Sequence, residues 1–248
     1  MLLALAMAAA AGSIGAFAVL RRMTLASDAI SHIALPGIGL ALMLGAPPLL
    51  GGGAALLVGT LLVWAVERRT RVPTEAIIGV VFSSALAIGA LLASGRDLID
   101  ALFGSPGRPG PGETAFGLVA STVVIVFVIR ARDRLVVRLV SPDLARTAGI
   151  DVARLDLAFL LAFALAVSLG LRFLGVLLMG SLIIIPGATA KHLARSLSQM
   201  FAISVAIAAA CTLLGSLLAS RLGLERGPLS IALAAVVFFG SLSLRRRD

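Results

Sequence analysis

The chain has 248 residues, of which 60% are hydrophobic and only 13% are charged, and its formal net charge is +9. A soluble domain has about one-quarter charged residues, so this composition excludes a soluble globular protein and indicates an integral membrane protein. The positive charge does not indicate nucleic-acid binding, because the arginines occur in short clusters between apolar stretches. Clusters of this kind are typical of membrane topology signals. The lone Cys211 provides neither a disulfide framework nor a cysteine-rich metal site.

Nine apolar stretches of the sequence are each near the length that a helix needs to cross a bilayer, about 20 residues. We therefore expect an all-α, polytopic membrane protein of about nine (eight to ten) membrane helices, with residues 1–248 in a single domain. The expected spans are 2–20, 24–45, 49–66, 76–93, 115–130, 155–172, 174–190, 200–220 and 229–244. No basic segment precedes the first stretch, so we interpret it as a retained span rather than a cleaved signal peptide.

The basic residues sort onto the two sides of this arrangement unequally. One side carries 16 of the 21 Lys and Arg residues, within 21–22, 68–71, 130–154, 191–195 and 245–247. The other side carries Arg96, Arg108, Arg172, Arg221 and Arg226. Because cytoplasmic loops are enriched in Lys and Arg, the first side is predicted to be cytoplasmic. The N-terminus is then outside the cytoplasmic membrane and the C-terminus inside.

Two connections are longer than the others. The outer connection, 94–114, begins with a candidate interfacial helix over 96–103 and continues into a Pro/Gly-rich irregular loop. The inner connection, 131–154, is predicted to be the largest cytoplasmic piece. Residues 31–37 resemble residues 181–187, and the two spans concerned cross in opposite directions, which would fit an inverted repeat of five helices.

The second expected span contains two ionisable residues four positions apart, Asp28 and His32. An intramembrane ionisable residue indicates a functional site, because burying its charge in hydrocarbon is costly. The spacing places both side chains on one helix face, with Cβ atoms about 6 Å apart. The Ser31 hydroxyl is adjacent, and Pro36 lacks the N–H that would bond to the His32 carbonyl. These nitrogen and oxygen donors suit a divalent ion such as zinc or manganese.

Other interpretations of the pair remain open at this stage. Asp28 and His32 could form a structural hydrogen bond between helices, or a proton relay of the kind that pumps use. The remaining polar residues are weaker candidates: His192 is interpreted as a surface residue of an inner helix, and Glu75 as an acidic residue at a helix start. The sequence contains no phosphate-binding loop and no common hydrolase motif, so the chain is not expected to bind ATP in that way itself.

The motifs together resemble bacterial ABC importer permeases for zinc, manganese and iron. The resemblance rests on Arg21-Arg22-Met23, Asp28 to His32 and Leu35-Pro36-Gly37, followed in order by 75–79, 102–104, 143–150, 175–178, 184–190 and 227–228. It implies a type II ABC importer permease fold and a homodimer of permeases with the ion path at the two-fold axis. A separate cytoplasmic ABC ATPase would drive transport, and an extracytoplasmic metal-binding protein would deliver the ion. Two departures from the family's usual pattern are Ser27 in place of glycine and Gly187 in place of alanine.

The resemblance also implies roles for particular residues. Asp28 and His32 match the motif of the ion path, with Ser31 and Pro36 as lesser candidates, and the metal is the transported substrate rather than a resident cofactor. The segment 186–199 resembles the element that docks on the ATPase. We expect it to contain a short amphipathic helix in which Leu193 and Leu197 form an apolar i,i+4 pair. Its candidate coupling residues are Pro186, Lys191, His192, Leu193, Arg195 and Leu197.

The sequence therefore predicts a transport subunit that catalyses no covalent chemistry. Two alternatives belong to other classes. A self-sufficient proton- or ion-coupled secondary carrier would work without an ATPase, and an intramembrane enzyme would use Asp28 and His32 as acid and base.

Overall fold

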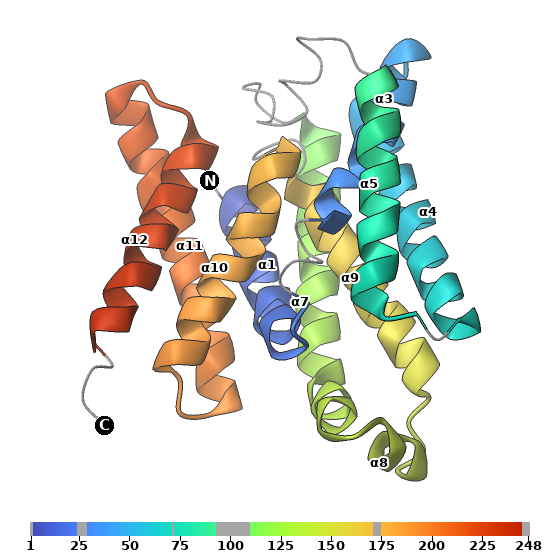
Figure 1. The fold of residues 1–248 in the computed structure, drawn as a ribbon. Coiled ribbons are helices and arrows are strands. Elements are labelled where there is room, and N and C mark those ends of the chain that lie inside the picture. Colours follow the sequence, from blue (N-terminus) through green and yellow to red (C-terminus); the bar gives the residue numbers. More distant parts are fainter. Residues whose placement is uncertain (1, 24–28, 71, 93–109, 171–174, 245–248) are drawn as a thin grey trace.

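The computed structural model describes residues 2–23, 29–70, 72–92, 110–170 and 175–244 (Figure 1). Within these ranges the chain is helical and forms no strand, as the composition predicts. The helices are α1 (Leu2–Leu20), α3 (Ala34–Met43), α4 (Pro48–Arg69), α5 (Thr74–Leu92), α7 (Pro111–Val140), α8 (Pro142–Thr147), α9 (Val152–Gly170), α10 (Gly175–Leu193), α11 (Leu197–Leu222) and α12 (Arg226–Leu244). A short helical turn over residues 29–32 precedes α3.

Seven helices of the described chain are long and apolar enough to cross a membrane, namely α1, α4, α5, α7, α9, α11 and α12. Each overlaps one of the expected spans. The other two expected spans, 24–45 and 174–190, correspond to shorter apolar helices, Ala29–Met43 and Leu178–Leu193. A multi-pass helical membrane protein is thus confirmed, whereas the number of nine crossings and the inverted repeat stay predictions.

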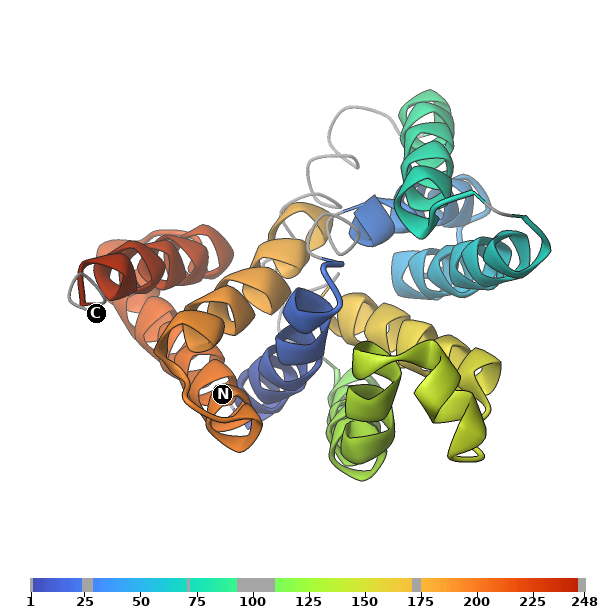
Figure 2. The same cartoon turned by 60° about the horizontal axis from the view of Figure 1, so that its bottom comes forward.

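Helix α1 occupies the centre of the bundle, in contact with α7, α9, α10 and α11. Most of its residues from Met7 onward are buried, and many are Ala, Gly or Ser, whose small side chains let neighbouring helices approach closely. Figures 1 and 2 show α10, α11 and α12 on one side of α1 and the α3–α5 group on the other, with α7 and α9 completing the centre.

Glycines mark the closest helix contacts in both halves of the bundle. A Cβ atom on Gly187 of α10 would lie 2.7 Å from the carbonyl oxygen of Gly15 in α1, and a Cβ on Gly15 would overlap the carbonyl of Ile183. In the other half, Gly37 of α3 and Gly51 of α4 each face the other's backbone carbonyl in the same way. The contact with Gly15 gives a physical reason for glycine at position 187, where alanine is usual in the resembling permeases.

The region expected to form the inner connection, 131–154, is largely helical, which corrects the predicted end of the fifth span. Helix α7 continues from Pro111 to Val140 and is followed by α8, so its 30 residues extend about 45 Å, beyond the hydrocarbon thickness. The charged residues between 130 and 138 lower the mean hydropathy of this continuation, so hydropathy alone does not predict it. Val124, Val128, Ala131 and Leu135 nevertheless stay buried at helical spacing and hold the extension on the bundle. The candidate interfacial helix 96–103 lies outside the described residues.

The connections rich in basic residues gather at one end of the bundle. Helices α1, α4, α7 and α10 end there, and α5, α9 and α11 begin there, at the bottom of Figure 1. The connections α3–α4 and α11–α12 lie at the opposite end. The predicted division of the loops into two sides therefore agrees with the fold; which side is cytoplasmic stays a prediction. We call the bottom end of Figure 1 the basic end.

Candidate functional site

The candidate ion-binding segment is a broken helix. Helical turn 29–32 stops at Ile33, whose amide donates to the carbonyl of Ile30 at 3.1 Å, and α3 begins at Ala34. Pro36 lies in the first turn of α3 and has no amide proton to offer the His32 carbonyl. A break at membrane depth is tolerated where the backbone is buried in protein or lines a water-filled path. Here it is buried in protein, because Ile30, Ser31, Ile33 and Ala34 are all nearly inaccessible.

His32 is held inside the bundle by neighbouring helices. Its ring is 8% exposed and meets the ring of Phe82 from α5 edge-on, with centroids 5.4 Å apart. The next residue, Ile33, packs over Gly59 of α4, where the missing side chain leaves space for it. Leu35 packs against Gly89 of α5 in the same manner. The imidazole and the residues after it are therefore held by two neighbouring helices, α4 and α5, rather than by their own segment alone.

The structure describes only part of the predicted site. It buries the neighbouring residues His32 and Ser31, and their role as metal ligands stays a prediction. Asp28 lies outside the described residues, so its approach to His32 stays a prediction. No cluster of three or more His, Cys, Asp and Glu side chains occurs within the described ranges. If this site holds a metal ion, it must draw on Asp28, on backbone or hydroxyl oxygens, on water or on a partner chain.

A charged cavity of about 470 Å³ opens at the basic end, and we call it the inner cavity. Its polar lining comes from four helices and the segment after α1: Arg21, Arg22, Glu67, Glu75, Arg138 and Asp156. Glu75 and Ile78 line the cavity, and Phe82 follows them on the same face of α5. Because seven residues span about 10 Å of helix, the cavity lies about two turns below the side chain that contacts His32. Glu75, Ile78 and Phe82 thus align the inner cavity with His32 along one face of α5.

The wall of the inner cavity is fixed by a buried ion-pair network. Asp156 of α9 accepts from Arg21 at 2.6 Å through one carboxylate oxygen and from Arg138 of α7 at 3.1 Å through the other. Arg21 also stacks over the ring of Phe159, 4.6 Å from its centroid. Burial lowers the pKa of the Arg21 guanidinium, and attraction to Asp156 opposes that effect. The network joins α1, α7 and α9 at the basic end.

The candidate coupling segment 186–199 has a different local structure from the predicted one. Helix α10 contains Pro186 and runs to Leu193, and α11 begins at Leu197, so the two leucines are not an i,i+4 pair on one helix. A capped turn separates them: the Ser196 hydroxyl accepts from the amide of Gln199, whose side chain accepts from the amide of Arg195. Ser196 thus caps the N-terminus of α11, and the Leu spacing alone did not predict this second helix start.

The same turn presents several candidate coupling residues at the molecular surface. Lys191, Leu193 and Arg195 are exposed at the basic end, and Leu197 is half-buried. His192 instead places its ring edge-on to Phe238 of α12, with centroids 6.1 Å apart. The turn therefore combines exposed basic and apolar side chains with a direct contact to the last helix.

Sequence reasoning did not identify Asp156, Glu67 or Phe82 as part of the site. Asp156 lies in an expected span, and its acidic side chain at membrane depth was the available signal. Glu67 lies next to the basic residues Arg68 and Arg69, and the topology argument considered only the basic residues. Phe82 had no local signal, because an aromatic residue in an apolar helix becomes informative only when the opposing helix is known.

A helical membrane bundle with a broken helix, a buried imidazole and a charged opening at one end defines a protein of the membrane transporter class. Within that class the chain belongs to the ABC 3 transport family, whose model matches residues 1–245. It is therefore a membrane-spanning permease subunit of the ABC transporter type.

Individual relatives match over nearly the whole chain. The manganese import system permease protein ScaB of Streptococcus parasanguinis is 30% identical over 241 residues, covering 95% of this chain and 85% of that protein. The high-affinity zinc uptake system membrane protein ZnuB of Haemophilus influenzae is 28% identical, covering 94% and 92%. Among solved structures, PsaBC from Streptococcus pneumoniae in complex with Fab superposes with a TM-score of 0.83 at 25% identity, covering 97% of this chain and 88% of that one.

Proposed function

We propose that this chain is the permease subunit of an ATP-driven importer that carries a divalent transition-metal ion, zinc, manganese or iron, across the bacterial cytoplasmic membrane. The observation that carries the proposal is His32, an imidazole buried in a broken membrane helix about two turns above a charged cavity. Nitrogen and oxygen donors suit these ions. Relatives named for manganese and zinc transport support the same substrate class.

In this proposal the ion is a passing substrate. Asp28 and His32 are its principal ligands, with the Ser31 hydroxyl beside them. Phe82 and Gly59 fix the imidazole and its helix break, so the ligands are positioned before the ion arrives. Below them, Glu75 of the inner cavity provides a carboxylate on the same face of α5 as Phe82, along the route to the basic end.

The proposed partners follow from the two ends of the bundle. A cytoplasmic ABC ATPase docks at the basic end on the turn between α10 and α11, where Lys191, Leu193 and Arg195 are exposed. Leu197 begins α11 directly after this turn, Pro186 lies within α10 about two helical turns before it, and His192 links the turn to α12 through Phe238. An extracytoplasmic metal-binding protein docks at the opposite end, and two permeases associate with the ion path between them. The chain itself hydrolyses no ATP.

Metal accumulation in cells tests the proposal. Cells expressing the chain together with its cognate ATPase and binding protein are expected to accumulate one of the three metals. Asp28→Ala and His32→Ala should each reduce accumulation at least about tenfold, while membrane insertion is unchanged. Asp133→Asn, which removes an exposed carboxylate from α7, is the matched control and should transport normally. Full accumulation by both site variants would exclude the proposed ligands.

Energy coupling separates this function from a secondary carrier. An inactive ATPase should abolish accumulation, whereas an uncoupler should have little effect while ATP is maintained. Accumulation that survives loss of the ATPase and collapses with the uncoupler would identify a proton- or ion-coupled carrier instead.

A further inference from the structure

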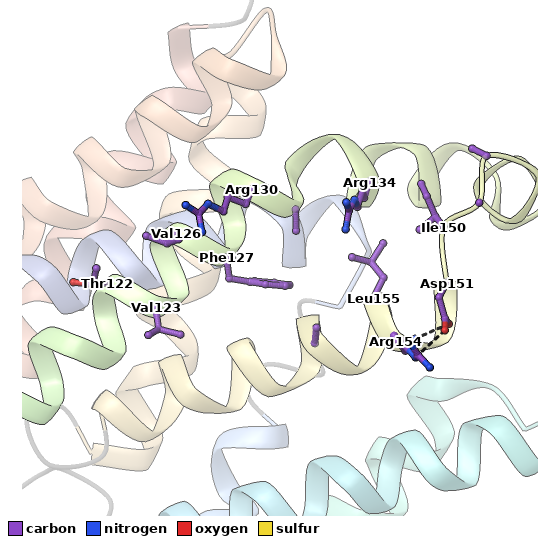
Figure 3. Close-up of a pocket in the computed structure, with 14 residues that line it drawn as sticks. Thr122, Val123, Val126, Phe127, Arg130, Arg134, Ile150, Asp151, Arg154 and Leu155 are labelled. Atoms are coloured by element: carbon purple, nitrogen blue, oxygen red, sulfur yellow. Dashed lines mark hydrogen bonds and ion pairs between the residues drawn. The ribbon is translucent and has the colours of Figure 1, made fainter.

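A second cavity, of about 880 Å³, lies between α7 and α9 near the basic end (Figure 3). We call it the α7–α9 groove. It is separate from the inner cavity and shares no lining residue with it. Its walls change character along the helices, from Val123, Val126 and Phe127 in the apolar part of α7 to Arg130 and Arg134 toward the end.

The order of these residues along α7, apolar first and basic afterwards, matches the change from hydrocarbon to headgroups across a bilayer. Positions 123, 126, 130 and 134 recur at intervals of three or four, so they form one stripe of α7. Val123 lies about 10 Å from Arg130 along the helix. Val123 is 52% and Val126 39% exposed, as expected for side chains that face lipid acyl chains. The arginines therefore lie where the hydrocarbon ends and phospholipid headgroups begin.

The two α7 arginines carry charge that the described part of the chain does not neutralise. Arg154, across the groove on α9, pairs with Asp151, with Nε and Oδ2 3.0 Å apart. Arg130 and Arg134 make no ion pair with any other described residue. Figure 3 shows both on α7, with Leu155 and Arg154 on the α9 side. Two guanidinium groups one helical turn apart suit a phosphate, which each can bind through paired N–H donors.

We propose that the α7–α9 groove binds an anionic phospholipid, with its phosphate on Arg130 and Arg134 and an acyl chain along Val123, Val126 and Phe127. The positive charge of the two arginines favours an anionic headgroup. The apolar wall favours a lipid over free phosphate, because free phosphate has no acyl chain to pack against it. Basic recesses between membrane helices on the cytoplasmic side are suitable sites for such headgroups. The proposal does not depend on which ion the permease carries.

Lipid retention by the purified full-length chain tests this directly. Native mass spectrometry would count lipids bound after titration with phosphatidylglycerol or, separately, with zwitterionic phosphatidylcholine. The wild type should retain phosphatidylglycerol preferentially. The variant Arg130→Gln/Arg134→Gln should lose roughly tenfold or more of this affinity, given the attraction that each basic residue contributes near an anionic surface. Inorganic phosphate at the same concentration should not displace the lipid.

The matched control is Arg68→Gln/Arg69→Gln, which also removes two positive charges. Both residues lie in the last turn of α4 at the basic end, and neither lines the groove. It should bind phosphatidylglycerol like the wild type. If the double arginine variant proves unstable, Ala158→Phe fills the groove from α9 without changing charge and should also reduce retention.

Three results would overturn the proposal. The first is equal phosphatidylglycerol retention by wild type, groove variants and control. The second is displacement by inorganic phosphate at equal concentration, which would indicate a simple anion site. The third is unchanged lipid binding with lost ATPase association in Arg130→Gln/Arg134→Gln, which would make the groove a protein interface.

Discussion

Arg21, the first residue after α1, and Asp156, in the second turn of α9, form an ion pair in which Nη2 and Oδ1 are 2.6 Å apart. The side chains are only 11% and 13% exposed, and Arg138 of α7 holds the second carboxylate oxygen. One carboxylate thus pairs with two arginines, one directly after α1 and one in α7. Arg21 therefore stabilises the wall of the inner cavity, in addition to belonging to the basic cluster that predicts the topology.

Replacing Asp156 by Asn should destabilise the protein by about 3–5 kcal/mol, because it leaves a buried guanidinium without its counter-charge. Thermal unfolding followed by size-exclusion recovery in detergent would measure this loss. The exposed pair Arg146–Asp143 is the control, with side chains 66% and 87% exposed. Asp143→Asn should cost about 1 kcal/mol or less. Equal effects of the two substitutions would show that the Asp156 network contributes no more than a surface pair.

The sequence predicted the helical elements well because apolar length and charge clusters are local signals. The first span and α1 share the bounds 2–20. The missing amide proton of Pro36 was a local signal too, although the break at Ile33 was not predicted. Contacts between elements had no such signal. Neither the Arg21–Asp156 pair nor the Phe82 contact with His32 can be read from a single helix, because each depends on which faces meet.

Local reasoning also failed where two patterns competed. The spacing of Leu193 and Leu197 indicated one helix, but the Ser196 hydroxyl accepts from the Gln199 amide and caps a new helix that begins at Leu197. The extension of α7 was missed for the opposite reason: Arg130 and Arg134 lower the hydropathy although Ala131 and Leu135 continue the buried stripe. The Ser196 hydrogen bond thus outweighed the leucine spacing, and the packing of Ala131 and Leu135 outweighed the low hydropathy of the α7 extension.

Two glycines of α4 that lie two residues apart should respond oppositely to alanine. A Cβ on Gly51 would overlap the carbonyl of Gly37 in α3, so Gly51→Ala must separate the helices and should lower the thermal unfolding temperature. A Cβ on Gly53 meets nothing within 4 Å, so Gly53→Ala should be neutral or should stabilise the helix by about 0.5–1 kcal/mol. The thermal unfolding temperatures of both variants and of the wild type are measured in the same detergent. A stability loss of the same size in both variants would contradict the close α3–α4 contact.

The family's usual alanine should be poorly tolerated at position 187 of this chain. The added Cβ would lie 2.7 Å from the carbonyl oxygen of Gly15, and α1 can yield little because it is packed on several sides. We expect Gly187→Ala to reduce thermal stability, with Gly240→Ala in α12, where nothing lies within 4 Å, as the control. Wild-type stability of Gly187→Ala would mean that α1 and α10 are farther apart than described.

Glu75 should matter for release of the ion into the cytoplasm. It lines the inner cavity on the face of α5 that carries Phe82, so Glu75→Gln removes a carboxylate from the route below His32. We expect the maximal rate of metal accumulation to fall severalfold, with stability unchanged because the side chain is exposed. Glu225→Gln, an exposed carboxylate at the opposite end, is the control. A Glu75→Gln rate equal to that of the wild type would remove this carboxylate from the proposed route.

The turn between α10 and α11 offers the most direct test of ATPase docking. Lys191 and Arg195 are exposed there, and Arg195 donates to the Gln199 side chain through its backbone amide, which a side-chain substitution leaves in place. Charge reversal in Lys191→Glu/Arg195→Glu should therefore leave the fold intact while it repels an acidic docking surface. We expect co-purification of the ATPase to fall at least about tenfold and metal accumulation to fall with it. Arg221→Glu, at the opposite end of α11, should retain the ATPase. Undiminished co-purification by the double variant would place the docking surface elsewhere on the basic end, with α8 as the next exposed segment to test.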